Sequence, residues 1–196
     1  MHIYRPRSAR VTAVAIVGVA ALVAAARIAG DGLRAAAPAV GLAALVAIAG
    51  YLAYWRPSIG VGPDAIAVRN VFRRTTVPLG HIVHVDTKWA LELYLDDGRK
   101  LTAFAAPAPG AFAARTMRAD DARGLPRGSY LDGTVRPGDR RGTPSGDAAV
   151  LVRTALATHR KGDADAAAGP VAHQDDRFAV IALGVGLAAA VAGFLI

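Results

Sequence analysis

The sequence predicts a membrane protein in which a small antiparallel β domain lies between transmembrane helices. Three observations predict this fold class: long uncharged apolar runs, a segment with the alternation of short strands, and a net charge of +8. The 196-residue chain is 54% hydrophobic, which is rich for a soluble domain. The excess is concentrated in residues 11–26, 35–55 and 178–196, which contain no Asp, Glu, Lys or Arg.

The apolar runs have the length of membrane spans. A helix needs roughly 20 apolar residues to cross a hydrocarbon core, and both 35–55 and 178–196 reach about that length. The first run is shorter, but Arg27 can extend a helix over about 11–27 by directing its charge outward. We therefore expect three spans, the last formed by residues 178–196.

Residues 1–56 are expected to hold an N-terminal segment and a two-helix transmembrane hairpin, with Gly30 and Gly32 at the turn. A cleaved signal peptide is the alternative for the first run, because that run has a basic start and an Ala-rich end. Tyr51, Tyr54 and Trp55 close the second run, as is typical of the headgroup region.

The last run contains two glycines, Gly184 and Gly186, which are expected to let helices approach closely.

Basic residues beside the runs predict the orientation. Lys and Arg are enriched on cytoplasmic flanks, and they gather at the N-terminus and at both ends of the middle segment. We expect a multi-pass protein of the cell membrane, with its N-terminus and β domain in the cytoplasm and its C-terminus outside.

Residues 57–106 have the composition of short strands separated by turns. Leu91, Leu93 and Leu95 alternate with polar positions, so they are expected to face the core. Asp97-Gly98 predicts a two-residue hairpin turn with positive φ at both positions.

Three further segments follow the strands. Residues 107–146 are rich in Pro, Gly and Arg and are expected to form a mobile loop, with a short helix around 111–117 as an option. Residues 147–161 predict a helix that closes the β domain, capped by Ser145 or Asp147. Residues 162–177 predict a polar linker.

Four stretches of the middle segment carry a resemblance to a known family: residues 56–61 (RPSIGV), 64–70 (DAIAVRN), 73–78 (RRTTVP) and 95–99 (LDDGR). They resemble bacterial pleckstrin-homology-like (PH-like) membrane proteins related to the low molecular weight protein antigen 6 family of actinobacteria. Leu79-Gly80 stands where that family often has Trp. The resemblance implies a curved antiparallel sheet closed by a C-terminal helix.

The resemblance does not imply phosphoinositide binding, because the first hairpin loop, residues 60–64, contains no Lys or Arg. Arg69, Arg73 and Arg74 lie at the next turn, and Arg56 ends the second apolar run. These four arginines are the candidate contacts to lipid headgroups or to the membrane surface. A solvated turn that only satisfies the charge bias is the alternative.

No residue pattern supports catalysis, so we expect a protein that is not an enzyme. The chain has no Cys and no nucleophile or phosphate-binding motif. His81, His84 and Asp86 fall short of a metal site. We therefore expect no metal, cofactor or small-molecule substrate. We also expect no nucleic-acid partner, since the basic residues are spread along the chain.

The sequence favours a membrane-anchored, non-catalytic interaction module that binds a protein partner or the anionic membrane surface. An accessory subunit of a larger membrane complex, acting through its Ala- and Gly-rich helices, is the alternative. A small transporter or membrane enzyme is disfavoured because the centres of the runs carry no ionisable residue.

Overall fold

The computed structural model describes residues 1–110, 130–131, 134–161 and 169–195. Contacts divide the chain into two compact units, each described separately. The β unit comprises Met1–Pro6, Ser58–Asn70 and Arg74–Gln174. The helical unit comprises Arg7–Pro57, Val71–Arg73 and Asp175–Ile196. The short segment Val71–Arg73 therefore groups with the helices, although strands flank it in the sequence.

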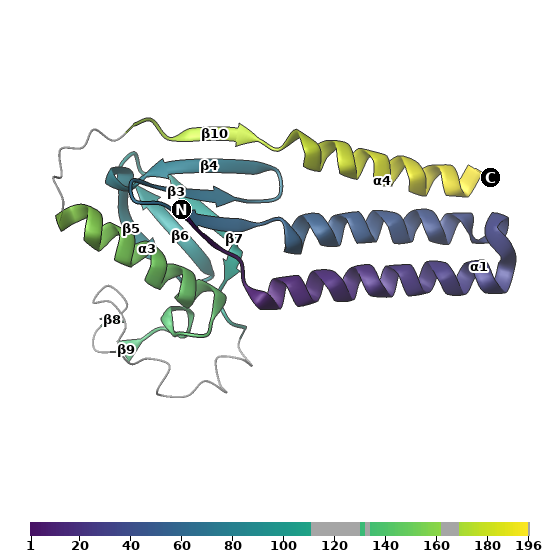
Figure 1. Cartoon of the computed structure of the whole chain (residues 1–196), viewed down its shortest axis with the longest axis horizontal. Helices are drawn as coiled ribbons and strands as arrows, with labels where there is room; N and C mark the ends of the chain where they lie inside the picture. The colour runs from purple at the N-terminus through teal and green to yellow at the C-terminus, as the bar shows by residue number, and fades with distance from the viewer. Residues whose placement is uncertain (111–129, 132–133, 162–168, 196) are drawn as a thin grey trace. The chain divides into compact units, whose positions relative to one another are not determined.

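The helical unit is built from two elements, α1 (Arg7–Gly50) and α4 (Arg177–Leu195), and α1 continues into a π-helical turn, η1 (Tyr51–Trp55) (Figure 1). Helical backbone runs through the predicted turn and is interrupted only at Gly32, with φ 77° and ψ 166°. Glycine tolerates this conformation because it has no Cβ. The prediction of two separate helices is therefore corrected to one helical element with a break.

The two ends of α1 approach each other. A Cβ added to Gly50 would lie 2.6 Å from Cγ2 of Ile16. In a straight helix these two residues would be about 50 Å apart. The chain of α1 therefore reverses direction at the break (Figure 1).

Glycines allow α4 to pack closely on α1. A Cβ added to Gly41 would meet the carbonyl oxygen of Ala189 at 2.6 Å, and one added to Gly186 would meet Cδ1 of Ile48 at 3.0 Å. At Gly184 the same addition meets nothing within 4 Å. The packing role predicted for two glycines is thus confirmed for Gly186 and wrong for Gly184.

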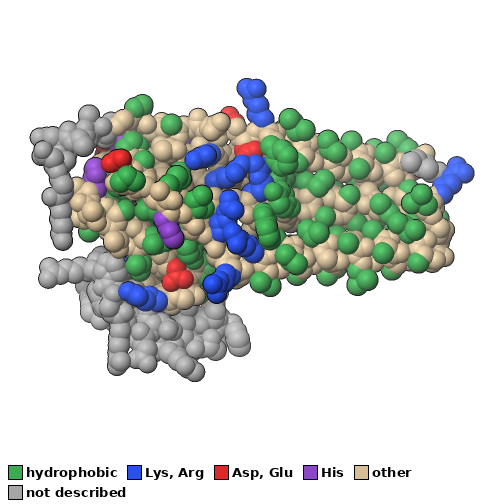
Figure 2. Space-filling model, in the orientation of Figure 1, with side chains coloured by type: hydrophobic (Ala, Val, Ile, Leu, Met, Phe, Trp, Pro, Cys, Tyr) green, Lys and Arg blue, Asp and Glu red, His purple; other side chains and the backbone are tan. Residues whose placement is uncertain are grey.

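In the part of the chain that the structure describes, two helices are long and apolar enough to cross a membrane, Arg7–Trp55 and Arg177–Leu195. In their most apolar windows only 11% and 22% of the residues, respectively, are buried. A core helix of a soluble protein would bury most of its apolar side chains. Here hydrophobic side chains cover the outside of the helices (Figure 2), as expected of a surface that lipid or another protein covers.

Among the described residues, the β unit contains two larger antiparallel sheets, with strand orders β1-β2-β3-β4-β10 and β5-β6-β7, and a separate two-stranded one. The strands are β1 (His2–Tyr4), β2 (Ser58–Val61), β3 (Ala65–Arg69), β4 (Arg73–Pro78), β5 (Ile82–Asp86), β6 (Ala90–Leu95), β7 (Lys100–Pro107) and β10 (Ala172–Asp175). A 3-10 turn, η2 (Leu79–His81), joins β4 to β5. Strands β2–β7 correspond to the short strands predicted for residues 57–106.

Two strands of the larger sheet were not foreseen. Strand β1 comes from the N-terminal segment and pairs with β2, placing His2 opposite Val61. Burial raises the pKa of Tyr4 in β1 to about 12, and the nearby Asp147 carboxylate adds to this shift. Strand β10 forms within the predicted polar linker, next to β4.

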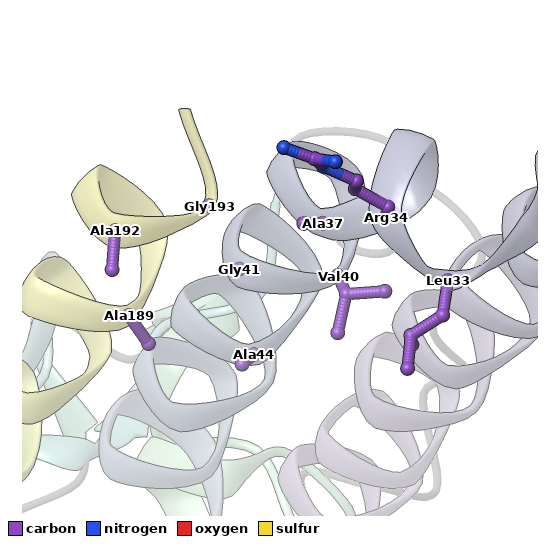
Figure 3. Close-up of a pocket in the computed structure, with 9 residues that line it drawn as sticks. All are labelled: Leu33, Arg34, Ala37, Val40, Gly41, Ala44, Ala189, Ala192 and Gly193. Carbon is purple, nitrogen blue, oxygen red and sulfur yellow. The ribbon is translucent and has the colours of Figure 1, made fainter. Parts of the chain in front are cut away.

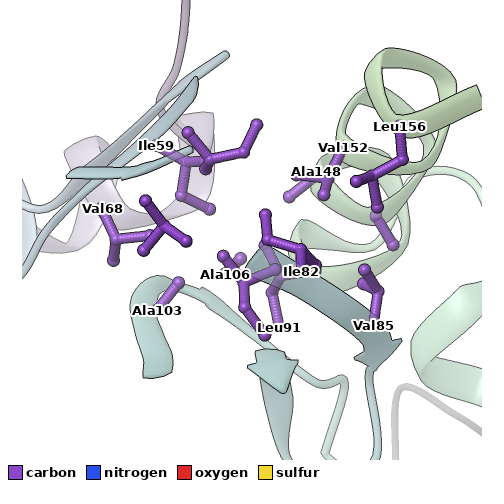
Figure 4. Packing of buried hydrophobic residues seen from close by; sticks show 14 of the residues in the cluster. Ile59, Val68, Ile82, Val85, Leu91, Ala103, Ala106, Ala148, Val152 and Leu156 are labelled. Carbon is purple, nitrogen blue, oxygen red and sulfur yellow. The ribbon is translucent and has the colours of Figure 1, made fainter. Parts of the chain in front are cut away.

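The core of the β unit lies between the sheets and helix α3 (Pro144–Lys161). Leu91 and Leu93 are fully buried and Leu95 is nearly so, which confirms the predicted inward face of β6. Val152 and Leu156 of α3 point toward the strands in Figure 4. Helix α3 thus covers the sheets at the position predicted for the closing helix.

Helix α3 begins slightly earlier than predicted, and Thr143 caps it. The Thr143 hydroxyl accepts a hydrogen bond of 2.9 Å from the Gly146 amide, which is the usual capping geometry. Ser145 instead donates to the Gly138 carbonyl oxygen at 2.7 Å, and Asp147 accepts from the Gly142 amide at 2.8 Å. Both residues predicted as caps thus fix the preceding turn.

The segment predicted to be a mobile loop lies largely outside the described residues, including the optional helix at 111–117. Its described parts include the strand pair β8 (Tyr130–Leu131) and β9 (Thr134–Val135) and the 3-10 turn η5 (Pro137–Asp139).

The β6–β7 hairpin differs from the predicted two-residue turn. The Gly98 amide donates to the Leu95 carbonyl oxygen at 3.1 Å, so Asp96 and Asp97 are the central residues of the turn. Gly98 then follows with φ 79°. This is the pattern of a three-residue loop in which glycine occupies the bulge position.

Candidate functional site

Arg56 takes part in a buried ion pair rather than in an open surface. Its guanidinium lies 2.9 Å from a carboxylate oxygen of Asp176, and the two side chains are 11% and 9% exposed. It also lies over the ring of Phe178, 4.6 Å from the centroid. Because these contacts occupy its guanidinium, Arg56 is not a candidate contact to lipid headgroups.

The tip of the β3–β4 hairpin is fastened to the start of α4. The amide of Asp176 donates a hydrogen bond of 2.7 Å to the carbonyl oxygen of Phe72. Arg73 Nε lies 3.2 Å from a carboxylate oxygen of Asp175, and both of these side chains are well exposed. The Phe72 side chain is 52% exposed. The helical unit thus holds an exposed aromatic ring and an exposed cation beside the first turn of α4.

The same hairpin carries two arginines in direct opposition. Arg69 of β3 pairs in register with Arg74 of β4. Like charges directly opposite each other destabilise a sheet. Arg74 is exposed and, within the described part of the chain, has no ion-pair partner.

Asn70 explains how this hairpin is positioned. Its side-chain amide donates to the Thr102 carbonyl oxygen at 2.8 Å, and its side-chain oxygen accepts from the Phe104 amide at 3.0 Å. One side chain therefore satisfies two backbone groups of strand β7. The sequence placed Asn70 at a turn, but its partners lie more than thirty residues away and could not be foreseen.

Aromatic residues also lie in η1, at the C-terminal end of α1. Tyr51, Tyr54 and Trp55 are partly exposed, at 41%, 44% and 37% respectively. The Arg10 guanidinium lies 5.6 Å from the Trp55 ring centroid. Rings and cations of this kind are enriched at headgroup depth in membrane proteins.

A second polar cluster surrounds His81. The Nδ1 atom of His81 lies 2.8 Å from a carboxylate oxygen of Asp96, and Nε2 lies 3.1 Å from the Gly169 carbonyl oxygen. Both partners are acceptors, so satisfying both requires the doubly protonated ring. The hydrogen bond that His81 donates to the Asp96 carboxylate raises the pKa of His81.

Neighbouring contacts extend this cluster to strand β10. Nε of Arg99 donates to Asp97 at 2.6 Å, and the Arg99 backbone amide, which also bonds this carboxylate, lowers its pKa. His173 lies 3.1 Å from the Thr75 hydroxyl and 3.5 Å from Arg99. These side chains hold the β10 segment against the sheets.

The histidines do not converge on a metal. His84 lies against the Tyr94 ring, with centroids 5.8 Å apart, whereas His81 faces Asp96. Among the described residues, no group of three or more His, Cys, Asp or Glu side chains is arranged to hold an ion.

One family model matches the chain, under the description "Bacterial PH domain", over residues 56–128. These residues form a bacterial PH domain. No curated protein and no solved structure matches the chain. The matched part of the PH domain includes strands β2–β7, and with them Asn70 and the opposed arginines of the β3–β4 hairpin. It ends before α3, so α3, β1 and β10 add to the matched region.

Proposed function

We propose that this chain is a membrane-anchored, non-catalytic PH-domain protein that binds the anionic surface of the membrane. One observation carries the proposal: the hydrogen bond between Phe72 and Asp176 fixes the tip of the β3–β4 hairpin at the first turn of α4. If α4 crosses the membrane, that tip lies at headgroup depth.

The apolar helices support the anchoring. We infer that α1 crosses the membrane twice, as a hairpin broken at Gly32, and that α4 crosses it once. The low burial of both helices and the exposed rings near Trp55 support this placement. The Lys and Arg bias of the flanks favours a cytoplasmic PH domain in a multi-pass protein of the cell membrane.

The arginines of the hairpin supply the attraction. Each Arg near an anionic leaflet contributes about 1 kcal/mol, so Arg69, Arg73 and Arg74 together contribute a few kcal/mol. Because the chain is already anchored, this energy orients the PH domain rather than recruiting it. Phe72 adds an apolar side chain at the same tip.

Hydrogen exchange of the full chain in lipid nanodiscs tests the proposal. We expect the amides of the β3–β4 tip to exchange more slowly in phosphatidylglycerol than in phosphatidylcholine. The double variant Arg69→Gln/Arg74→Gln should reduce this difference by up to about 30-fold, which leaves only the contribution of Arg73. Lys88→Gln removes a charge from another exposed turn and should leave the difference intact. Equal exchange of the unsubstituted chain in both lipids would refute the proposal.

A protein partner is the second candidate, as an accessory subunit of a larger membrane complex. Open space beside Gly18 and Gly184, where an added Cβ meets nothing within 4 Å, favours a further helix on the α1 and α4 surface. Replacing the helices by unrelated spans would abolish binding of such a partner, whereas a partner of the PH domain would be retained.

The relation to the low molecular weight protein antigen 6 family also remains a proposal. It rests on the stretches 56–61, 64–70, 73–78 and 95–99. A non-catalytic role is proposed because the polar cluster around His81 is occupied by contacts that hold β10.

A further inference from the structure

Two hollows of the molecule differ in their lining. In the helical unit, mostly small apolar side chains such as Ala189 and Ala192 line a groove between α1 and α4 (Figure 3). In the β unit, a hollow is bordered mostly by ionisable side chains: His81, Asp96, Asp97 and Arg99, together with Pro170 and Val171. A group that changes its charge near neutral pH, His81, therefore lies directly against the segment that leads into β10.

Strand β10 is attached to the larger sheet with little burial of apolar surface. It lies at the edge of that sheet, and all four of its residues, Ala172–Asp175, are exposed. The preceding Val171 is partly buried against the core. Segments that bury little apolar surface open at a low free energy. The attachment of β10 therefore depends strongly on polar contacts, and two of these are made by histidines.

His81 contacts the segment before β10 with one of its ring nitrogens. Nε2 lies 3.1 Å from the Gly169 carbonyl oxygen, and Nδ1 lies 2.8 Å from a carboxylate oxygen of Asp96. Both partners are acceptors, so both contacts are hydrogen bonds only when the ring carries two protons. Attachment at Gly169 together with the Asp96 contact therefore requires the cationic form of His81.

The charges that face His81 favour its cationic form. From the β6–β7 turn, Asp96 and Asp97 both act to retain the second proton. Arg99 also borders the hollow, but its charge is offset by Asp97, whose carboxylate lies 2.6 Å from Arg99 Nε. On the side of β10, the described residues 169–171 carry no ionisable side chain.

His173, within β10, has the opposite requirement. Its Nδ1 lies 3.1 Å from the Thr75 hydroxyl of β4, which can accept or donate a hydrogen bond. Its Nε2 lies 3.5 Å from a guanidinium nitrogen of Arg99, a group that only donates. A second proton on His173 would place two cations in contact. Two residues further along β10, Asp175 pairs with Arg73. The contact with Arg99 therefore requires a neutral His173.

We propose that His81 and His173 form a pH-dependent latch, which holds β10 firmly only while His81 is doubly protonated and His173 is neutral. As the pH rises, His81 loses a proton and can no longer donate to both of its acceptors. As the pH falls, His173 gains a proton and is repelled by Arg99. Firm attachment of β10 is therefore confined to an intermediate range of pH. The raised pKa of His81 extends this range upward.

The latch controls the chain that leads into α4. Strand β10 ends at Asp175, and α4 begins at Arg177. Neither the contact of Asp175 with Arg73 nor that of Asp176 with Phe72 involves a histidine, so both remain when β10 is released. Release therefore adds the residues of β10 before Asp175 to the free chain between the larger sheet and α4.

Hydrogen exchange of the full chain in detergent tests the latch. The measured quantity is the protection factor of the β10 amides, which compares their exchange with that of an unstructured chain at the same pH. It should pass through a maximum as the pH is varied across the ordinary histidine pKa of about 6.5. On the high-pH side it should fall by about tenfold, the effect of losing one hydrogen bond to a charged group. It should also fall on the low-pH side.

Three variants assign the two sides of this profile. His81→Gln keeps a donor for the Gly169 carbonyl oxygen without a titrating group, so it should abolish the fall at high pH. His173→Asn keeps a partner for Thr75 and should abolish the fall at low pH. His84→Gln is the matched control, because His84 is exposed and lies against Tyr94. It should keep both falls.

Protection that does not depend on pH in the unsubstituted chain would overturn the inference, as would both falls persisting in His81→Gln and His173→Asn. A second measurement needs no substitution. At the pH of greatest protection, NMR of the ring nitrogens should show His81 doubly protonated and His173 neutral. Any other combination of the two protonation states would also overturn the latch.

Discussion

The carbonyl oxygen of Phe72 accepts a hydrogen bond of 2.7 Å from the amide of Asp176, the residue that directly precedes helix α4. The hairpin tip therefore contacts the start of an apolar helix through backbone atoms. Because the contact is made by the backbone, substitution of Phe72 would not remove it. The side chains around this contact give the first prediction.

Arg56→Met should destabilise the helical unit by about 3–5 kcal/mol, because it leaves the Asp176 carboxylate buried without its cation. Thermal unfolding of the full chain in detergent measures the loss. Arg27→Met is the control: its ion pair with Asp31 is exposed, so its loss should cost less than about 1 kcal/mol. Equal effects of the two substitutions would contradict the buried role of Arg56.

Asn70→Ala should lower the stability of the PH domain by about 1–3 kcal/mol, since two backbone groups of β7 lose their partner. The Phe104 amide should lose its protection in hydrogen exchange. Gln174→Ala removes an exposed amide side chain and should change neither quantity. Retained protection of Phe104 in Asn70→Ala would argue against the bridge.

Gly41→Ala should destabilise the contact between the helices by about 1–3 kcal/mol, because its Cβ would lie 2.6 Å from the Ala189 carbonyl oxygen. Gly184→Ala adds the same methyl group where nothing lies within 4 Å. In a helix interior it should be neutral or stabilising by up to about 1 kcal/mol. Thermal unfolding in detergent compares them, and the reverse order would contradict the packing.

His81 should give pH-dependent stability. Its folded pKa is raised by Asp96, so its contribution is fully present below the unfolded value of about 6.5. That contribution is lost as the pH rises through the raised folded pKa. NMR titration of the His81 ring should show a higher pKa than in the Asp96→Asn variant. An unchanged pKa in that variant would rule out the proposed cause.

Local pattern was sufficient to predict most of the PH domain. The alternation of Leu91, Leu93 and Leu95 predicted the buried face of β6, because side chains in a strand alternate between its two faces. The Asp97-Gly98 pair located a turn but not its type, since Gly98 follows the turn rather than forming its centre.

Contacts between distant residues could not be predicted in this way. Strand β1 pairs with β2, which places His2 opposite Val61. Arg56 forms its hydrogen bond with Asp176, which lies 120 residues away in the sequence. Such pairings depend on the assembled fold, which no local period records. Arg56 was for this reason grouped with the surface arginines, although its environment is buried.

Single-cysteine labelling tests the central claim most directly, because the native chain has no Cys. Asp31→Cys places a probe near the break in α1, and Lys88→Cys places one on an exposed turn of the PH domain. A reagent that cannot cross membranes should label only the Asp31→Cys chain in intact cells, and both chains after lysis. Labelling of Lys88→Cys in intact cells would contradict a PH domain anchored at the cytoplasmic surface.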